Sequence, residues 1–283
     1  MEQHKTGTLY LCATPIGNLE DITYRVLRTL KEVDLIAAED TRNSIRLLNH
    51  FEIKTPMTSY HEYNKIEKAY QLVAKMREGK NIALITDAGT PAISDPGEEV
   101  VKQAIINNIE IIPIPGACAL INALICSGMN TKEFSFYGFL PLNKKLRKNK
   151  FEEIKKENKT IILYEAPHKI TQTLKDLYEE LGDINIVIAR ELTKIHEEFI
   201  RGKIGEIIEK YSELKGEIII IIEGNKINNS ENEIKDLLNN MTLDEHYEYY
   251  KKQNLEKKEI IKKIAKDRNV NKNEIYMELI NKK

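Results

Sequence analysis

The segment Thr86-Asp87-Ala88-Gly89-Thr90-Pro91-Ala92-Ile93-Ser94-Asp95-Pro96-Gly97 directly follows the apolar run Ile82-Ala83-Leu84-Ile85. A short apolar run bounded by turn residues is typical of a buried strand. In an open α/β sheet, small molecules bind beyond the carboxyl ends of the strands. Gly89 allows the backbone to approach a ligand where a Cβ atom would collide. The segment therefore predicts a strand that leads into a ligand-binding loop, although an ordinary strand-to-helix turn would have the same pattern.

The same arrangement occurs four more times along the chain. Apolar runs at 10–13, 109–114, 160–163 and 186–189 each lead into a loop of small or polar residues. Strands alternate with amphipathic stretches through the first half, which predicts a mostly parallel sheet covered by helices on both faces. We expect Asp21 to cap the first helix, which carries Val26, Leu27 and Leu30 on one face.

Two changes in composition divide the chain into three predicted parts. A polar, basic segment begins after Pro141, and an Asn-rich segment covers Asn225–Asn232. The predicted fold class is α/β, with an N-terminal α/β lobe over 1–141 and a second α/β lobe over 142–225. Strands expected over 185–190 and 197–201, with no helix between them, predict a mixed sheet in the second lobe.

The last part, residues 233–283, is predicted to be a small helical domain that resembles a helix-turn-helix. Helices expected over 255–268 and 273–281 would pack through Ala265, Val270, Ile275 and Leu279.

Composition limits the possible functions. The 43 basic and 44 acidic residues nearly cancel, so a nucleic-acid site would have to be a local patch. Cys12, Cys118 and Cys126 lack CxxC spacing and suit a reducing cytoplasm. The polar first seven residues and the short aliphatic run Ile218–Ile222 predict neither a signal segment nor a membrane span. The scattered histidines have no metal-ligand spacing, so we expect no metal site. The G-x-G-x-x-G and P-loop fingerprints are absent.

Several motifs match a known family across residues 7 to 224, namely Ala13–Thr23, Ala38–Arg42, Asp87–Gly97, Pro115–Leu120, Tyr164–Lys169, Arg190–Lys194 and Gly216-Glu217. Through them the chain resembles the tetrapyrrole methylase superfamily of S-adenosylmethionine (SAM) enzymes, and within it the methyltransferases of small-subunit ribosomal RNA. The resemblance implies two α/β lobes with SAM in the cleft between them. It also implies 2′-O-methylation of a cytidine in 16S ribosomal RNA of the small ribosomal subunit, and a homodimer.

The family's motifs also imply a set of cofactor-binding residues, which in this chain are Pro15, Ile16, Asp87, Gly89, Thr90, Ile93, Cys118, Ala119 and Tyr164. The superfamily often has an acidic residue at the position of Thr90, which leaves open whether Asp87 or Thr90 contacts the polar end of the cofactor. Simple helix packing is the alternative for Cys118 and Ala119.

A ribose hydroxyl is a poor nucleophile, so a base or an orienting dipole would help the transfer. The candidate carboxylates are Glu39, Asp40, Glu165 and Glu191. We predict catalytic roles for Asp40, Glu191 and Lys194, because a lysine beside a carboxylate would act as a base if its pKa were lowered. The alternative is that Asp40–Arg42 and Glu191–Lys194 are structural ion pairs.

A dense basic run between the two lobes predicts contact with RNA phosphates, through Lys144, Lys145, Arg147, Lys148 and Lys150. Residues 257–268 form a second basic patch. A solvated helix face is the alternative for each. Two other functions remain open: a methylase of a tetrapyrrole ring, and a non-catalytic RNA-binding protein of the same fold.

Overall fold

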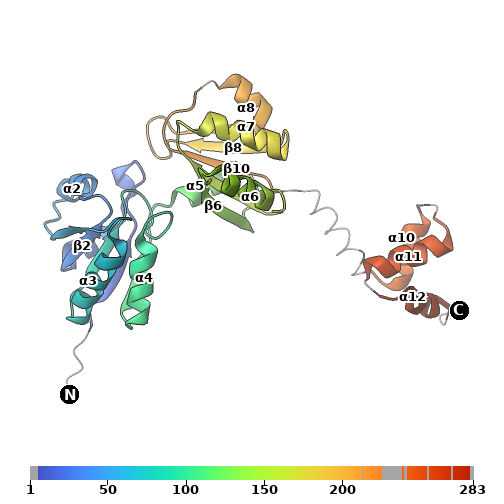
Figure 1. Cartoon of the computed structure of the whole chain (residues 1–283), viewed down its shortest axis with the longest axis horizontal. Helices are drawn as coiled ribbons and strands as arrows, with labels where there is room; N and C mark the ends of the chain where they lie inside the picture. Colours follow the sequence, from blue (N-terminus) through green and yellow to red (C-terminus); the bar gives the residue numbers. More distant parts are fainter. Residues whose placement is uncertain are drawn as a thin grey trace, which may run out of the picture. The chain divides into compact units, whose positions relative to one another are not determined.

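The computed structural model describes residues 6–211, 213–224, 238, 241–253, 255–268 and 270–280. The chain divides into two compact units (Figure 1). The first comprises Met1–Lys155 and Lys159–Glu223, and the second comprises Lys156–Asn158 and Gly224–Lys283. The expected lobe boundaries at 142 and 233 stay predictions. The predicted linker Asn225–Asn232 and residue 233 lie outside the described residues.

The first sheet of the first unit is parallel and has five strands in the spatial order β3-β2-β4-β1-β5. In chain order the strands are β1 (Thr8–Cys12), β2 (Leu35–Ala38), β3 (Met57–Ser59), β4 (Ile82–Ile85) and β5 (Glu110–Ile114). Because all five run in one direction, the loops after β1, β2, β4 and β5 leave from the same edge.

Helices cover both faces of this sheet, as the sequence predicts. They are α1 (Tyr24–Glu32), α2 (Thr41–His50), α3 (Lys65–Arg77) and α4 (Gly97–Ile106). Alternate strand residues point to opposite faces, so Leu84 packs in one cluster with Met76 of α3 and Val100 of α4. Its neighbour Ala83 packs in the other cluster with Val26 of α1 and Leu48 of α2.

The start of α1 differs from the prediction. Thr23, not Asp21, caps the helix, and its hydroxyl accepts a hydrogen bond of 3.2 Å from the Val26 main-chain N–H. Asp21 instead ends a short 3-10 turn, Leu19–Asp21. Val26 and Leu30 are fully buried, so the predicted apolar face is confirmed although its cap lies two residues later.

The second sheet is mixed and has the order β6-β7-β10-β8-β9. Its strands are β6 (Phe134–Phe139), β7 (Thr160–Glu165), β8 (Asn185–Arg190), β9 (Glu198–Lys203) and β10 (Ile218–Ile222). Only β6 and β7 pair in parallel, and the other three pairings are antiparallel. The predicted mixed sheet is therefore confirmed.

One helix connects the two sheets. The second sheet carries α6 (Lys144–Ile154), α7 (Ile170–Leu181) and α8 (Ile204–Lys210) on one face. Its other face packs on α5 (Ala119–Ser127), which follows β5 of the first sheet in the chain and lies beside the second sheet in Figure 1. Because α5 begins at the edge of the first sheet and buries its apolar side on the second, it brings the two sets of loops into one unit.

The second unit contains the helices α10 (Leu243–Lys251), α11 (Lys257–Asp267) and α12 (Lys272–Ile280). The predicted helical tail is confirmed, and Ala265 and Ile275 are buried in its core as expected. Val270 was assigned wrongly to that core, because it lies in the turn before α12 with 40% of its surface exposed. The sequence reading also missed α10, which begins with a capping box between Thr242 and Glu245.

Candidate functional site

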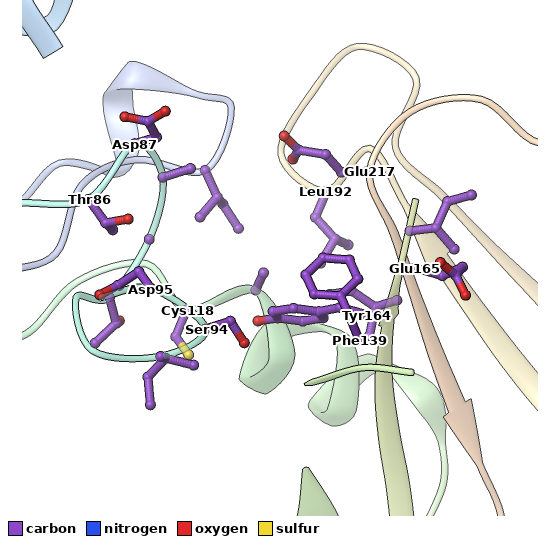
Figure 2. A pocket seen from close by; sticks show the side chains of 18 of the residues that line it. Thr86, Asp87, Ser94, Asp95, Cys118, Phe139, Tyr164, Glu165, Leu192 and Glu217 are labelled. Carbon is purple, nitrogen blue, oxygen red and sulfur yellow. The ribbon is translucent and has the colours of Figure 1, made fainter. Parts of the chain in front are cut away.

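A cavity of about 430 Å³ lies where loops of the first sheet face β7 and β10 of the second (Figure 2). We call it the main cavity. Its lining from the first sheet comprises Ile16, Glu39, residues 86–90 and residues 93–95, and α5 adds Cys118 and Ala119. The second sheet and its loops add Phe139, residues 164–167, Leu192 and residues 217–219.

A short main-chain bridge joins the loops after β1 and β4. The Thr14 N–H donates to the Gly89 carbonyl at 2.9 Å, and the Gly89 N–H donates to the Thr14 carbonyl at 3.1 Å. Gly89 has a φ of +86°, and a Cβ atom there would lie 3.2 Å from the Ile16 side chain. Glycine is therefore required at position 89 for two reasons: its backbone conformation, and the space that it leaves beside Ile16.

The turn before α4 is held by a half-buried carboxylate, that of Asp95. One oxygen of Asp95 accepts hydrogen bonds from the Ala92 N–H at 2.9 Å and the Gly97 N–H at 2.7 Å. Ala92 and Ser94 adopt positive φ angles of 68° and 64°, which L-residues rarely do. The other oxygen of Asp95 is buried without a hydrogen-bond partner among the described residues, and burial raises the pKa of this carboxyl.

Aromatic rings form the floor of the cavity in the view of Figure 2. The Tyr164 ring makes edge contacts with Phe136 and Phe139, at centroid distances of 4.9 and 5.7 Å. Burial raises the pKa of Tyr164 to about 12, so its phenol stays neutral at physiological pH. The Thr90 hydroxyl, which also belongs to the lining, donates to the Ala117 carbonyl at 3.0 Å.

Besides Asp95, three more carboxylates of the lining hold loops in place. Glu39 accepts a 2.6 Å hydrogen bond from the Thr86 hydroxyl. Asp87 accepts from the Asp40 N–H at 3.1 Å and from the Asn43 amide at 3.0 Å, which ties the β4 loop to α2. Glu165 is buried and accepts from the Thr173 hydroxyl. The fifth carboxylate of the lining, Glu217, has a side chain that is 72% exposed and lies 3.3 Å from the Lys194 ammonium group.

A second cavity of about 400 Å³ adjoins the first, and we call it the adjoining cavity. The two cavities share Ile16, residues 86–88 and Glu217 as a common wall. The rest of the adjoining cavity comes from Thr14, Pro15, Gly17 and Leu19, from Asn43, Ser44, Arg46, Leu47 and His50 around α2, and from Lys194.

Comparison with known proteins identifies the family. Residues 8–208 match the family described as Tetrapyrrole (Corrin/Porphyrin) Methylases. The ribosomal RNA small subunit methyltransferase I proteins of Halalkalibacterium halodurans and Bacillus subtilis are each 49% identical to this chain, and each match covers 95% of this chain and 93% of the relative. A solved diphthine synthase has a similar fold, with a TM-score of 0.60 at 12% identity over 76% of this chain and 90% of its own.

The chain belongs to the tetrapyrrole methylase family, in its ribosomal RNA small subunit methyltransferase I group. It is thus a methyltransferase, and the family and fold class predicted from the sequence are confirmed. Among the described residues, no helix is both long and apolar enough to cross a bilayer. In the same part of the chain, no three His, Cys, Asp or Glu side chains are grouped to hold a metal ion.

The methylase brings together most of the residues that the sequence assigns to the cofactor. Eight of the nine line the main cavity: Ile16, Asp87, Gly89, Thr90, Ile93, Cys118, Ala119 and Tyr164. Pro15, the ninth, lines the adjoining cavity instead. Cofactor binding by these residues stays a prediction.

The three predicted catalytic residues are less well grouped. Lys194 lines the adjoining cavity, whereas Asp40 and Glu191 line neither of the two. Asp40 caps α2, and hydrogen bonds from the Arg42 side chain and main chain hold its pKa at about 2. The Glu217 N–H and the Lys194 ammonium group lower the pKa of Glu191. These two carboxylates are therefore weak bases in this structure.

The expected lowering of the Lys194 pKa is wrong. Burial opposes its charge, but the hydrogen bonds and charges of Glu191 and Glu217 outweigh burial, so the pKa of Lys194 is raised. Lys194 is therefore a cation at physiological pH and has no free lone pair with which to accept a proton.

Three of the five residues of the predicted RNA-binding run lie on the exposed side of α6. Lys144, Lys145 and Lys148 are exposed. Arg147 instead turns inward, where it pairs with Asp176 at 2.7 Å and donates to the Thr173 hydroxyl at 2.8 Å. Lys150 pairs with Glu153. Two of the five positive charges are thus already neutralised within the protein.

Several residues of the main cavity were missed by sequence reasoning, among them Phe139, Leu192, Ile218 and Ile219. They are apolar and come from strand ends or loops far apart in the chain, where no local pattern separates a cavity wall from a core. Glu217 had a usable signal, because it follows Gly216 in one of the matched motifs.

The packing of Glu191 against Gly216 yields a stability prediction. Gly216 has a φ of +90°, and a Cβ atom there would lie 2.3 Å from the Glu191 side chain. Gly128 has a similar φ of +78° with nothing within 4 Å of the same position. We expect Gly128→Ala to lose about 1 kcal/mol from backbone strain alone. Gly216→Ala should lose roughly 3 kcal/mol, because it also displaces Glu191 from its partners.

Urea unfolding followed by circular dichroism measures both losses. Equal losses in the two variants would mean that Glu191 moves aside without cost and that its contacts do not hold this loop.

Proposed function

We propose that this methyltransferase binds SAM in the main cavity and transfers its methyl group to the 2′-oxygen of a cytidine in 16S ribosomal RNA, within the small ribosomal subunit. The proposal rests chiefly on the main cavity, which combines an apolar slot with hydrogen-bond acceptors at the carboxyl ends of parallel strands. The names of the curated relatives support the choice of substrate. We further propose a cytoplasmic location, where ribosomal subunits are assembled, and a homodimer.

The residues of the main cavity fit the parts of SAM. Adenine needs an apolar slot, for which Ile93, Cys118 and Ile219 are suited. The ribose hydroxyls and the ammonium group need acceptors, and the unpartnered buried oxygen of Asp95 is one. Gly89 leaves open the space that a Cβ atom would fill. A volume of about 430 Å³ lies in the range of small-molecule sites.

Bound SAM would supply an electrophilic methyl group, and the chain's task is then to position the acceptor oxygen in line with it. We propose an electrostatic and orienting role for Lys194, because its raised pKa makes it a cation. Asp40 and Glu191 would position other groups and would not contact the substrate. Asp40 caps α2, and Glu191 holds the Lys194 ammonium group. Glu217 is an exposed carboxylate on the wall between the cavities and is the better candidate to accept a hydrogen bond from the ribose hydroxyl.

SAM binding can be tested at Gly89. Gly89→Leu places a branched side chain against Ile16 in the main cavity. Gly182→Leu is a matched control, because Gly182 has a φ of +81° and open space around it at the end of α7. Calorimetric titration should give at least a hundredfold loss of SAM affinity for the first variant and little change for the second. An unchanged SAM affinity in a folded Gly89→Leu protein would show that SAM does not bind in the main cavity.

The methylated product tests the function itself. Incubation of the chain with SAM and small ribosomal subunits from cells that lack the enzyme should add one methyl group to 16S ribosomal RNA, and mass mapping should find it on a ribose. The free nucleoside should not react, because RNA is recognised largely through shape and backbone. A methyl group on a base would contradict the proposal. Methylation of a tetrapyrrole, or SAM binding without any transfer, would favour one of the two alternative functions.

RNA contact by the exposed lysines of α6 is a separate proposal. Lys144, Lys145 and Lys148 would neutralise backbone phosphates and release counterions. Replacing all three with Ala should reduce the slope of log affinity for the subunit against log salt by about two to three units. Arg147→Ala is the control: it breaks a pair with Asp176 and should leave that slope unchanged. If the triple variant has the same salt dependence as the wild type, the three lysines form a solvated helix face and do not contact RNA.

A further inference from the structure

We propose that the adjoining cavity holds the nucleotide that receives the methyl group, with its phosphate beside Arg46 and His50 and its ribose at the wall shared with the main cavity. This proposal rests on the function proposed above. The cavity has room for such a ligand, because its volume of about 400 Å³ lies within the range of small-molecule sites.

An unsatisfied hydroxyl supports a polar ligand in this cavity. Ser44 is only 4% exposed, and its Oγ atom has no hydrogen-bond partner among the described residues. Its neighbour Asn43 does not supply one, because the Asn43 amide donates to Asp87. A buried hydroxyl without a partner lowers stability, so such a group in a cavity wall is best explained by a ligand that completes it.

The charges around the cavity give the ligand an orientation. Arg46 and His50 lie four residues apart on α2 and therefore share one side of the helix. Arg46 is exposed and makes no ion pair with any described residue. Its guanidinium group suits a phosphate, to which it can donate two parallel hydrogen bonds.

The shared wall has the opposite charge. Asp87 and Glu217 contribute to both cavities. Lys194 lies 3.3 Å from Glu217 and offsets its charge, so Asp87 is the carboxylate that would repel a phosphate there. A ribose hydroxyl is uncharged and can donate a hydrogen bond to a carboxylate. The nucleotide therefore enters with its phosphate at the α2 side and its ribose toward the main cavity, which is the orientation that transfer to a ribose oxygen requires.

The adjoining cavity also has an apolar part that a base can contact. Pro15, Leu19 and Leu47 supply it, and Leu19 is 40% exposed although it lines the cavity. A subsite for an inorganic anion would not need this apolar surface. A nucleotide uses both a charged surface, for its phosphate, and an apolar surface, for its base.

Steady-state methylation of small ribosomal subunits tests the assignment. Arg46→Ala should raise the KM for the subunit about tenfold, and Ser44→Ala about threefold, through lost hydrogen bonds to the nucleotide. SAM affinity, measured by calorimetry, should stay within twofold of the wild type in both variants. Arg77→Ala is the control, because Arg77 is exposed at the end of α3 and lines neither cavity.

Ser44→Ala has a second readout that separates ligand binding from a structural role. Its hydroxyl has no partner in the free protein, so the variant should unfold at the same temperature as the wild type or at a higher one. A lower unfolding temperature would mean that the hydroxyl serves the fold and would overturn its assignment to a ligand.

The remaining outcomes are equally decisive. An unchanged KM in both variants would show that the nucleotide does not bind in the adjoining cavity, and the proposed function would still hold. Reduced SAM affinity with an unchanged KM would assign the cavity to the cofactor. If the wild-type chain binds SAM but does not methylate the subunit, the proposed function fails and this inference fails with it.

Discussion

The main-chain bridge between Thr14 and Gly89 is the link on which the site depends. β1 and β4 are neighbours in a parallel sheet, so their loops leave from the same edge, and the antiparallel bridge joins these loops beyond the strands. The Thr14 hydroxyl reinforces it by donating to the Thr86 carbonyl at 3.2 Å. This pairing carries Ile16 into the main cavity and sets Gly17 against Lys194, where a Cβ atom would lie 2.6 Å from the lysine side chain. One pair of hydrogen bonds thus positions residues of both cavities.

Much of the polar chemistry around the site maintains its shape. Glu39 and Asp87 accept hydrogen bonds from neighbouring loops, and Asp95 closes the turn before α4. Among the described residues, six other than glycine have positive φ, and four of them lie beside the two cavities: Ala92, Ser94, Glu191 and Thr193. Such conformations cost about 1–3 kcal/mol each and persist only where surrounding contacts enforce them. Their concentration here indicates that the two loops are shaped for a ligand rather than for stability.

The sequence predicts those features that are encoded locally. Apolar runs that end in small residues predict the strands and the loops that follow them. The resemblance to the family assigns nine cofactor residues to these loops and strand ends, and eight of the nine line one cavity. Predictions fail where tertiary contacts decide between equivalent local signals. Thr23 and Asp21 are both good capping residues, but Asp21 belongs to the 3-10 turn Leu19–Asp21 and Thr23 caps the helix. The pKa of Lys194 depends on burial, on Glu191 three residues before it and on Glu217 23 residues after it, so the local pattern contains only part of the balance. The adjoining cavity could not be predicted from the sequence either, because its lining residues come from segments that only the tertiary fold brings together.

A shared fold leaves the acceptor of a methyl group undetermined, since a diphthine synthase has the same architecture at 12% identity. Selectivity for the acceptor must therefore come from side chains and not from the fold, and counts of charged residues along the sequence overestimate how many charges are free to bind. Arg147 belongs to the densest basic run of the chain, yet it pairs with Asp176 and contacts the Phe151 ring, so it stabilises the packing of α6 on α7. Arg46 is isolated in the sequence, yet it is exposed beside a cavity that contains an unsatisfied hydroxyl. The isolated arginine is thus the more informative residue about the substrate, because a positive charge can bind RNA only where the protein has not already neutralised it.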